Sequence, residues 1–351
     1  MTAFQTAEYD GLATPKRFAQ AGGRAHPFRN PVVLQAQKQH FMPSNTFNRS
    51  LFAVVLSLAL STLAEAQSSV GVRANGMGGA FVGVADDGTA VYWNPAGLAT
   101  GALASVNLEF GEFKPDGPGD RDGLNHGLVA ISLPPVGLAY YRQGVFGERP
   151  PGPAVTGDQG REEVRRSVHA FTTSTFAISL LQSLTEYVVV SATPKFVWGG
   201  ESFTVDVDAS AMLAITRFRL GVTARNLTTP SFALDDSGAE EAELATEVRV
   251  GGGWGSAWPG HSRVVVAVDG DVVTRATPSG ERRDLAAGVE TWWLARRLGV
   301  RGGLRGSTVG EARGVMTAGA SWMFSGMYLE GYWAGGDAGE RSWGLGLRYS
   351  F

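Results

Sequence analysis

Few side chains in this sequence could catalyse a reaction, and none falls into a known catalytic spacing. The 351-residue chain has no cysteine, which excludes thiolate catalysis, disulfides and cysteine-based zinc sites. Its five histidines include no pair four residues apart that could bind a metal from one face of a helix. After Gly76 and Gly78, a dinucleotide-binding loop would need a third glycine where Phe81 stands. We therefore expect no catalytic residue, no metal and no cofactor, and a protein that is not an enzyme.

Two carboxylates and one amide between residues 67 and 100 could serve as ligands or as acids and bases. Asp86 and Asp87 stand directly before a glycine, and Asn94 stands directly before Pro95. Such pairs are typical of turns, and Asp and Asn side chains also cap free N–H groups at helix starts. We therefore interpret the three residues as turn and cap residues, and expect Asn94-Pro95 to set a bend in this segment.

An apolar stretch near the start of the chain has the pattern of an export signal. Residues 51–64 are apolar apart from small hydroxyls, follow Arg49, and end in Ala64-Glu65-Ala66, which is the form of a cleaved signal peptide. At about 14 residues the stretch is too short to span a bilayer, which takes roughly 20. Translation from Met42 would give a signal peptide over 42–66 cleaved after Ala66, with 1–41 as an upstream extension or mis-start.

From about residue 101 onward apolar and polar side chains alternate, as they do in strands with two different faces. The last strand is the clearest case, because Gly344, Gly346, Arg348 and Ser350 form its other face. Its apolar face consists of Trp343, Leu345, Leu347, Tyr349 and Phe351. Periodicity alone does not tell a soluble sandwich, whose apolar face is buried, from a membrane barrel, whose apolar face meets lipid.

The lengths of the connections favour the barrel. We expect about fourteen strands, and the connections after odd-numbered strands include the long polar ones, at 113–123, 147–166, 228–243 and 272–280. Those after even-numbered strands are tight, at 134–135, 182–185, 216, 257–260, 295–296 and 325–326. One connection departs from this alternation: 199–200 follows the fifth strand, where a long connection is allowed, but it is short. Such alternation is typical of up-and-down membrane barrels, in which every backbone N–H and C=O is paired internally. We therefore predict an all-β fold, an antiparallel transmembrane β-barrel over 101–351 with a short N-terminal hatch, or plug, over 67–100.

Charged residues on the inward parity of these strands should line the lumen. An arginine facing lipid would cost about 2–4 kcal/mol near the midplane. The predicted lumen charges are Asp206, Asp208, Arg219, Arg225, Asp269, Arg305 and Arg348. The tight turn at 295–296 places Glu290 directly opposite Arg301, as a salt bridge that fixes register or anchors the hatch, or as a contact for a passing solute. For the inward glycines Gly299, Gly303, Gly344 and Gly346, we favour strand curvature over room for an inserted plug or for close packing.

The segment from 76 to 98 resembles the N-terminal signature of the FadL/PorV superfamily of outer-membrane barrels, and the PorV/PorQ branch in particular. The residues that carry the resemblance are Gly76, Gly78, Gly79, Asp86, Asp87, Trp93, Asn94, Pro95 and Gly97. Shorter matches follow at 221–227, 267–269, 288–290, 301–303 and 349–351. The resemblance implies a fourteen-stranded barrel with the hatch folded into its lumen.

Two functions follow from the resemblance. The first is outer-membrane transport or binding of an apolar or amphipathic small molecule, and the second is a PorV-like shuttle for exported proteins in a type IX-like secretion system, without solute transport. The long connections are polar and offer no apolar platform for a fatty acid. We expect contact with outer-membrane lipid and, through the C-terminal strand, with the barrel-assembly machinery. The net charge of −3 gives no basic surface for nucleic acid.

Overall fold

The computed structural model describes residues 66–115, 123–148, 155–156, 162–163, 168–200, 202–233, 241–256, 264–277, 280–337 and 339–351. The upstream segment 1–41 lies outside the described residues, and so does the expected signal peptide 42–66 except for Ala66. The turn at 257–260 and most of the polar connection 147–166 also lie outside them.

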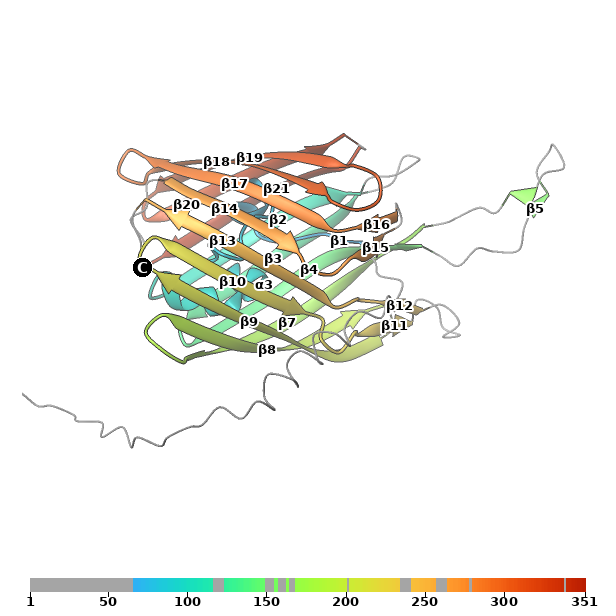
Figure 1. The fold of residues 1–351 in the computed structure, drawn as a ribbon, viewed down its shortest axis with the longest axis horizontal. Helices are drawn as coiled ribbons and strands as arrows, with labels where there is room; N and C mark the ends of the chain where they lie inside the picture. The colour runs from blue at the N-terminus through green and yellow to red at the C-terminus, as the bar shows by residue number, and fades with distance from the viewer. Residues whose placement is uncertain are drawn as a thin grey trace, which may run out of the picture. The chain divides into compact units, whose positions relative to one another are not determined.

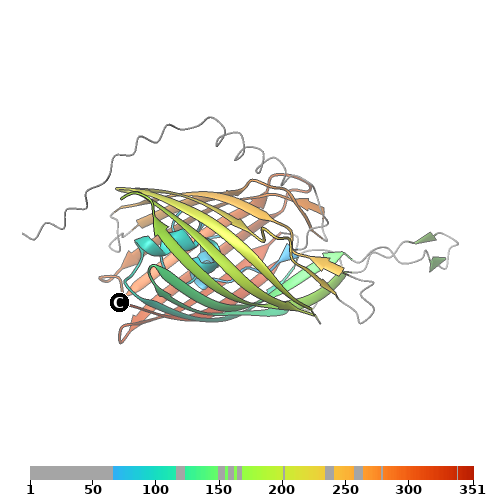
Figure 2. The ribbon, with the colours of Figure 1, turned by 90° about the horizontal axis from the view of Figure 1, so that it is seen from below.

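Within the described residues, fourteen antiparallel strands close into a barrel, which confirms the predicted fold class. Each strand pairs with the barrel strands before and after it in the chain, and the first pairs with the last, β2 with β21 (Figure 1). The strands run at a steep tilt around the barrel (Figure 2). They are β2 (Ser105–Lys114), β3 (Leu124–Leu133), β4 (Val136–Glu148), β7 (Val168–Ser183), β8 (Val188–Gly199), β9 (Ser202–Ile215), β10 (Phe218–Arg225), β13 (Glu247–Gly255), β14 (Val264–Asp271), β17 (Asp284–Trp293), β18 (Leu298–Ser307), β19 (Gly314–Phe324), β20 (Met327–Gly336) and β21 (Arg341–Ser350).

The outer face of the barrel is apolar. On β21, Leu345 is 57% exposed and faces out, whereas Arg348 is 7% exposed and faces the lumen. The other apolar residues of this strand and its end, Trp343, Leu347, Tyr349 and Phe351, are also exposed. Continuous apolar surface of this kind is that of a barrel whose outer face meets lipid. Among the described residues, no helix is both long and apolar enough to cross a membrane.

Three of the long connections contain short hairpins that the sequence pattern did not predict, because alternation over two or three residues carries no signal. They are β5 (Val155–Thr156) with β6 (Glu162–Glu163), β11 (Ser231–Ala233) with β12 (Glu241–Glu243), and β15 (Arg275–Thr277) with β16 (Gly280–Arg282). We call the end of the barrel that carries these connections the long-loop end and the opposite end the short-turn end. β15 also contacts β4, which lies across the barrel from the strands that flank the hairpin.

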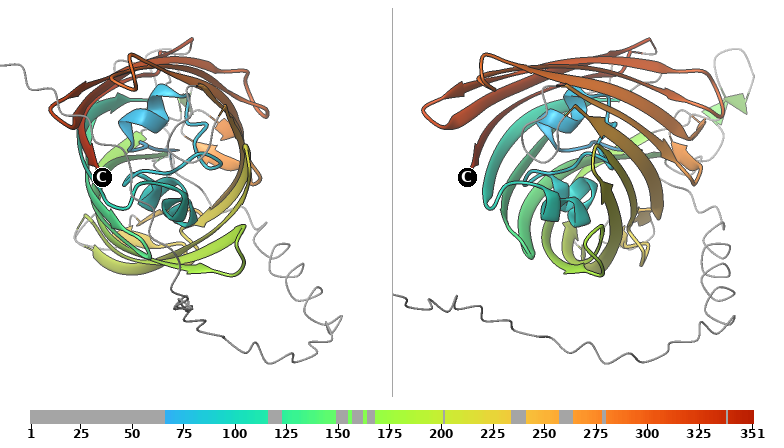
Figure 3. Two further views of the ribbon diagram at one scale, coloured as in Figure 1. Left: turned by 90° about the vertical axis from the view of Figure 1, so that its left-hand side faces the viewer. Right: turned by 60° about the vertical axis from the view of Figure 1, so that its left-hand side comes forward.

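The segment from 66 to 100 runs through the lumen from one end of the barrel to the other. β1 (Ala66–Gln67) pairs with Phe146 and Val145 of β4 at the long-loop end. The segment then forms α2 (Val72–Gly76), α3 (Ala90–Trp93) and the 3-10 helix η1 (Pro95–Thr100), and it reaches β2 at the short-turn end. Figure 3 shows these helices enclosed by the ring of strands. Much of the apolar core is formed by this segment, with Met77, Phe81 and Val82 fully buried.

Candidate functional site

The glycines of the motif sit where the hatch (residues 67–100) touches the barrel wall. Gly78 has a φ of +72°, which favours glycine, and a Cβ there would lie 2.9 Å from the backbone nitrogen of Leu304. From the other side, a Cβ on Gly303 would lie 2.2 Å from the carbonyl carbon of Met77. A Cβ on Gly76 would meet the side chain of Arg301 in the wall at 2.8 Å, whereas Gly79 and Gly97 approach other parts of the hatch, Trp93 at 3.3 Å and Ala85 at 2.1 Å. Gly78 therefore lets the hatch and the wall approach backbone to backbone, and Gly79 and Gly97 let the hatch fold closely on itself.

The inward glycines make room for neighbouring groups, and their role in strand curvature stays a prediction. Gly303 makes room for the hatch, and a Cβ on Gly346 would also meet Val72 of the hatch, at 3.4 Å. Gly299 and Gly344 instead make room for aromatic rings of the wall itself, those of Trp292 and Tyr332.

Asn94 ties the hatch to itself and to the wall, and its side chain caps no helix. It is fully buried, and its side-chain amide donates to the carbonyl oxygens of Val82, at 2.8 Å, and of Ala211 in β9, at 3.3 Å. Pro95 begins η1 directly after it. The indole N–H of Trp93 donates to the carbonyl oxygen of Val70 at 2.8 Å. The expected cap at Asn94 is thus wrong, because its amide is used to join two parts of the hatch across the bend.

The two aspartates of the hatch have different contacts. Asp87 makes a turn, since its Oδ1 accepts from both the backbone N–H and the hydroxyl of Thr89. Asp86 caps nothing and instead pairs with Arg73 and, at 3.6 Å, with Arg219 of β10. Arg73 is the only basic residue between 67 and 100, and it was not among the residues we singled out.

Arg73 binds Glu290 of β17 more closely than Arg301 does. The Nε and Nη2 atoms of Arg73 lie 2.9 and 2.7 Å from the Glu290 carboxylate. The register does place Arg301 opposite Glu290, but the nearest ion-pair atoms of those two residues are 3.7 Å apart. Arg301 also lies 3.3 Å from Glu330 of β20, which in turn pairs with Arg348 at 3.1 Å. A chain of buried ion pairs therefore joins the hatch to four strands of the wall, β17, β18, β20 and β21.

The charges around Arg73 keep its guanidinium ionised. Burial acts to lower the pKa of Arg73, but the carboxylates of Glu290, Asp86 and Asp87 outweigh burial and hold that pKa well above its ordinary value. Replacing Arg73 would take the closest cation from Glu290 and from Asp86, whose other cations, Arg301 and Arg219, are 3.7 and 3.6 Å away.

The remaining predicted lumen charges also face inward, and each has a partner. Asp206 and Asp208 both lie 2.7 Å from Lys195 of β8. Asp269 of β14 accepts from the backbone N–H groups of Phe81 and Val82 in the hatch, at 2.6 and 2.7 Å. Arg225 pairs with Glu247 and stacks over Tyr92, and Arg305 pairs with Glu340. The sequence analysis omitted Lys195, Glu247, Glu330 and Glu340; the first three lie in strands, where their inward parity could have identified them.

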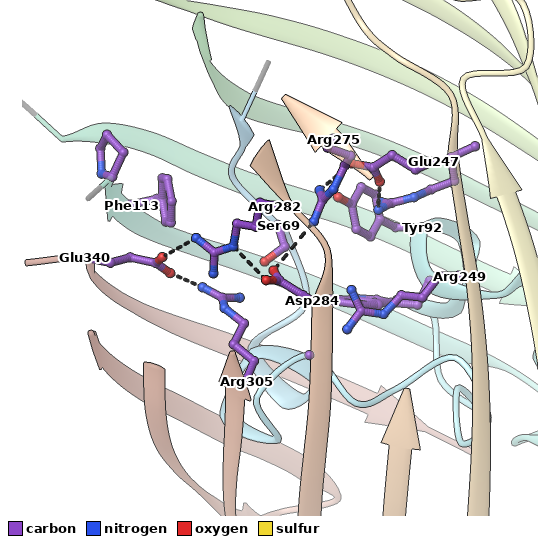
Figure 4. Close-up of a pocket in the computed structure, with 14 residues that line it drawn as sticks. Ser69, Tyr92, Phe113, Glu247, Arg249, Arg275, Arg282, Asp284, Arg305 and Glu340 are labelled. Carbon is purple, nitrogen blue, oxygen red and sulfur yellow. Dashed lines mark hydrogen bonds and ion pairs between the residues drawn. The ribbon is translucent and has the colours of Figure 1, made fainter. Parts of the chain in front are cut away.

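A pocket opens at the long-loop end, between the hatch and the wall, with about 770 Å³ of empty space including its mouth. We call it the outer pocket and define it by Tyr92, Trp93, Arg225, Arg249, Arg282 and Arg305. Glu247, Asp284, Glu340 and Arg275 also line it. Figure 4 shows Arg275, Arg282 and Arg305 converging on these three carboxylates. The pocket thus has charged walls and an aromatic floor.

A second hollow lies at the short-turn end, on the other side of the hatch. Arg73, Asp86 and Asp87 line it together with Trp292, Tyr328 and Arg348 of the wall. The Arg348 guanidinium stacks over the Tyr328 ring, 4.3 Å from its centroid. The ion-pair chain of Arg73 therefore stands at the floor of this hollow. In the described part of the chain, no group of three or more His, Asp or Glu side chains could hold a metal ion.

Comparisons with known proteins identify the fold. No family model matches the sequence, and no curated protein matches it closely. Among solved structures, the CymD monoaromatic hydrocarbon channel aligns with a TM-score of 0.59 at 12% identity, over 81% of this chain and 98% of that one. The Pseudomonas putida toluene transporter TodX aligns with a TM-score of 0.53 at 10% identity, over 82% and 98%. The resemblance to the FadL/PorV superfamily and to its PorV/PorQ branch stays a prediction, but the chain has the fold of these hydrocarbon channels, a barrel of fourteen strands.

Proposed function

We propose that this protein passes a small amphipathic molecule across the outer membrane through a barrel whose lumen is closed by the hatch. The observation that carries the proposal is that a pocket opens at each end of the lumen, the outer pocket and the hollow at the short-turn end, and that hatch residues line both. In this proposal residues 67–100 act as the hatch of the barrel 101–351. Residues 42–66 are a signal peptide cleaved after Ala66, and 1–41 is an upstream extension.

The hatch can move without disturbing the barrel. Its backbone hydrogen bonding with the wall is short: Gln67 of β1 pairs with Val145 of β4, and the Ser68 N–H donates to the carbonyl oxygen of Gly144 at 2.9 Å. Its other contacts are side-chain hydrogen bonds, ion pairs and apolar packing, such as those of Arg73, Asn94 and Asp269. Water entering the lumen can replace such polar contacts, whereas the strands stay paired because β2 and β21 close the ring.

The outward face of the barrel supports an outer-membrane location. The apolar surface described above suits lipid, and a closed barrel leaves no strand edge unpaired. The C-terminal strand, with its outward aromatic residues and its terminal Phe351, fits recognition by the barrel-assembly machinery. The alternative of a secretion shuttle finds no specific support, and the long polar connections on which it depends lie largely outside the described residues.

A reversible cross-link between hatch and wall tests the proposal. An ideal Cβ on Gly88 of the hatch lies 3.4 Å from the Cβ of Ala130 in β3, close to the separation of a disulfide, about 3.8 Å. The chain has no other cysteine, so Gly88→Cys with Ala130→Cys gives one defined bridge. We expect vesicles containing the oxidised variant to take up neither benzenesulfonate nor phenyl glucoside, two amphipathic probes that cross lipid slowly, and a reductant to restore uptake.

The two single-cysteine variants serve as controls and should transport under both conditions. Equal uptake by the oxidised and reduced double variant would show that the hatch need not move. Absence of uptake of both probes by the unmodified protein would overturn the proposed function altogether.

A further inference from the structure

We propose that the outer pocket binds the carboxylate of a small amphipathic solute, with its apolar part against the aromatic floor. This inference names the class of solute for the path described above and rests on the proposed function in that respect. The binding site itself is argued from the charges, unpaired donors and rings of the pocket.

The surface that faces the outer pocket carries more positive than negative charge. Five arginines line it against three carboxylates. A fourth carboxylate, Asp271, pairs with Arg249 and Arg275 from behind the lining, at 2.9 and 3.0 Å. A fifth, Asp269, is 3.7 Å from Arg249, but the same oxygen already accepts two backbone N–H groups of the hatch. Asp271 and Asp269 therefore balance the charge of the five arginines from outside the lining, and the groups that face the pocket are mainly guanidinium donors. Arginine binds carboxylates through paired N–H donors, so this lining suits an oxyanion.

Several guanidinium donors of this pocket are left without an acceptor. Arg249 is 8% exposed, and neither its Nε nor its Nη2 makes a hydrogen bond within the part of the chain that is described. The Nε atoms of Arg275 and Arg305 are in the same condition. A buried donor without a partner costs free energy, which a bound acceptor would recover. In Figure 4 the Arg249 guanidinium points toward the middle of the pocket.

The hairpin over the pocket holds two like charges against each other. Arg275 of β15 and Arg282 of β16 are direct register partners, and like charges opposite each other destabilise a ladder. Carboxylates relieve this repulsion. Arg275 pairs with Glu247, Asp271 and Asp284, at 2.7, 3.0 and 3.6 Å. Arg282 pairs with Asp284 and Glu340, at 2.7 and 3.2 Å. The hairpin thus holds both guanidinium groups in the lining of the pocket.

Aromatic rings form the floor below these arginines. The Arg225 guanidinium lies 4.2 Å from the centroid of the Tyr92 ring, and the Arg249 guanidinium lies 6.0 Å from that of Trp93. The two rings meet edge to face, 5.5 Å apart. Their stacking holds the guanidinium groups in place. Each of the two rings is only 4% exposed, and the partly exposed Phe113 of β2 adds apolar surface to the lining. A solute with a carboxylate and an apolar body matches both parts of the pocket.

Calorimetric titration of the full chain in non-ionic detergent micelles tests this inference. Benzoate should bind saturably at fixed ionic strength, and benzyl alcohol, which has the same ring without the charge, should bind at least about tenfold more weakly after correction for empty micelles. Arg249→Gln should weaken benzoate binding by about tenfold or more, and Arg249→Lys by less. The matched control is Arg283→Gln, since Arg283 neighbours Arg282 but bonds the exposed Thr308 instead.

Three outcomes would overturn the inference. One is equal binding of benzoate and benzyl alcohol, which the unmodified protein alone can show even if Arg249→Gln does not fold. Another is equal benzoate affinity in Arg249→Gln and Arg283→Gln. The third is inorganic phosphate binding more tightly than benzoate, which would indicate a site for a free anion. Because binding in micelles needs no transport, loss of uptake in vesicles with intact benzoate binding would refute the proposed function and leave this site standing.

Discussion

Arg73 is the residue on which the position of the hatch depends most. It is the one cation of the hatch and contacts carboxylates of both hatch and wall. Removing one partner of a buried ion pair typically costs about 3–5 kcal/mol, because the other charge stays buried alone. We therefore expect Arg73→Met to lower the free energy of unfolding in detergent by about 3 kcal/mol or more, measured by chemical denaturation. An exposed arginine at the start of β21 gives the control, Arg341→Gln, which should change it by less than about 0.5 kcal/mol.

A double variant separates lost charge pairing from lost packing. Replacing both partners, Arg73→Met with Glu290→Met, also removes the carboxylate that would otherwise lose its closest partner, and apolar replacements of buried ion pairs are often neutral. We expect the double variant to be more stable than Arg73→Met alone. If it were less stable than that single variant, Arg73 would act mainly through contacts other than Glu290.

A second prediction at the scale of single residues concerns Gly303, because its neighbour Gly302 on the same strand provides a matched control. A Cβ at Gly303 would overlap the Met77 backbone at 2.2 Å, whereas a Cβ at Gly302 would have its nearest neighbour, the carbonyl oxygen of Thr317, at 3.6 Å. Overpacking costs typically about 1–3 kcal/mol. Gly303→Ala should therefore destabilise the protein by at least about 1 kcal/mol and Gly302→Ala much less, measured by unfolding in detergent. Equal effects would mean that the hatch is not packed against β18 as described.

At the level of elements, the alternating pattern predicted all of the barrel strands, but not the path of the hatch. Strand parity is local, so Arg348 and Leu345 could be assigned to opposite faces from their positions alone. The tight turn likewise placed Glu290 opposite Arg301, which the register bears out. The partner that Glu290 binds most closely, Arg73, is 217 residues away in sequence, and no local pattern encodes that contact. The hairpin that brings Arg275 and Arg282 over the outer pocket could not be predicted from the sequence either, because it begins within a polar connection.

Removing the hatch should open the barrel without unfolding it. The strand ladder closes through β2 and β21 without help from residues 68–100, and lipid or detergent covers the outer face. We expect a variant lacking residues 68–100 to fold in detergent and to give large, steady conductance in planar bilayers, whereas the unmodified protein stays closed. The strand content of the deletion variant, measured by circular dichroism, is the control for folding. A deletion variant that fails to form strands would show that the hatch is part of the folding core.

On the scale of the whole molecule, the protein is built with its apolar surface outside and its charges inside. Large apolar side chains such as Phe218, Leu304 and Met316 are more than half exposed. The buried side chains, by contrast, include Asp206, Glu290 and other acidic and basic residues. A water-soluble sandwich with the same alternation would bury the apolar side chains and expose the charged ones. The facing of the strands is therefore the property that the hatch, the outer pocket and the proposed path all require.

Site-directed spin labelling can test this facing on a single strand. Leu345 is 57% exposed on the outer face of β21, and Ser342 on the same strand is 7% exposed and faces the lumen. The chain has no native cysteine, so Leu345→Cys and Ser342→Cys each introduce one attachment site. In reconstituted vesicles, oxygen, which concentrates in lipid, should relax a nitroxide at 345 strongly and one at 342 weakly, because residues of opposite parity point to opposite sides of the wall. The reverse order would mean that the charged face meets lipid, and the lumen charges, the hatch contacts and the solute path would then be wrong together.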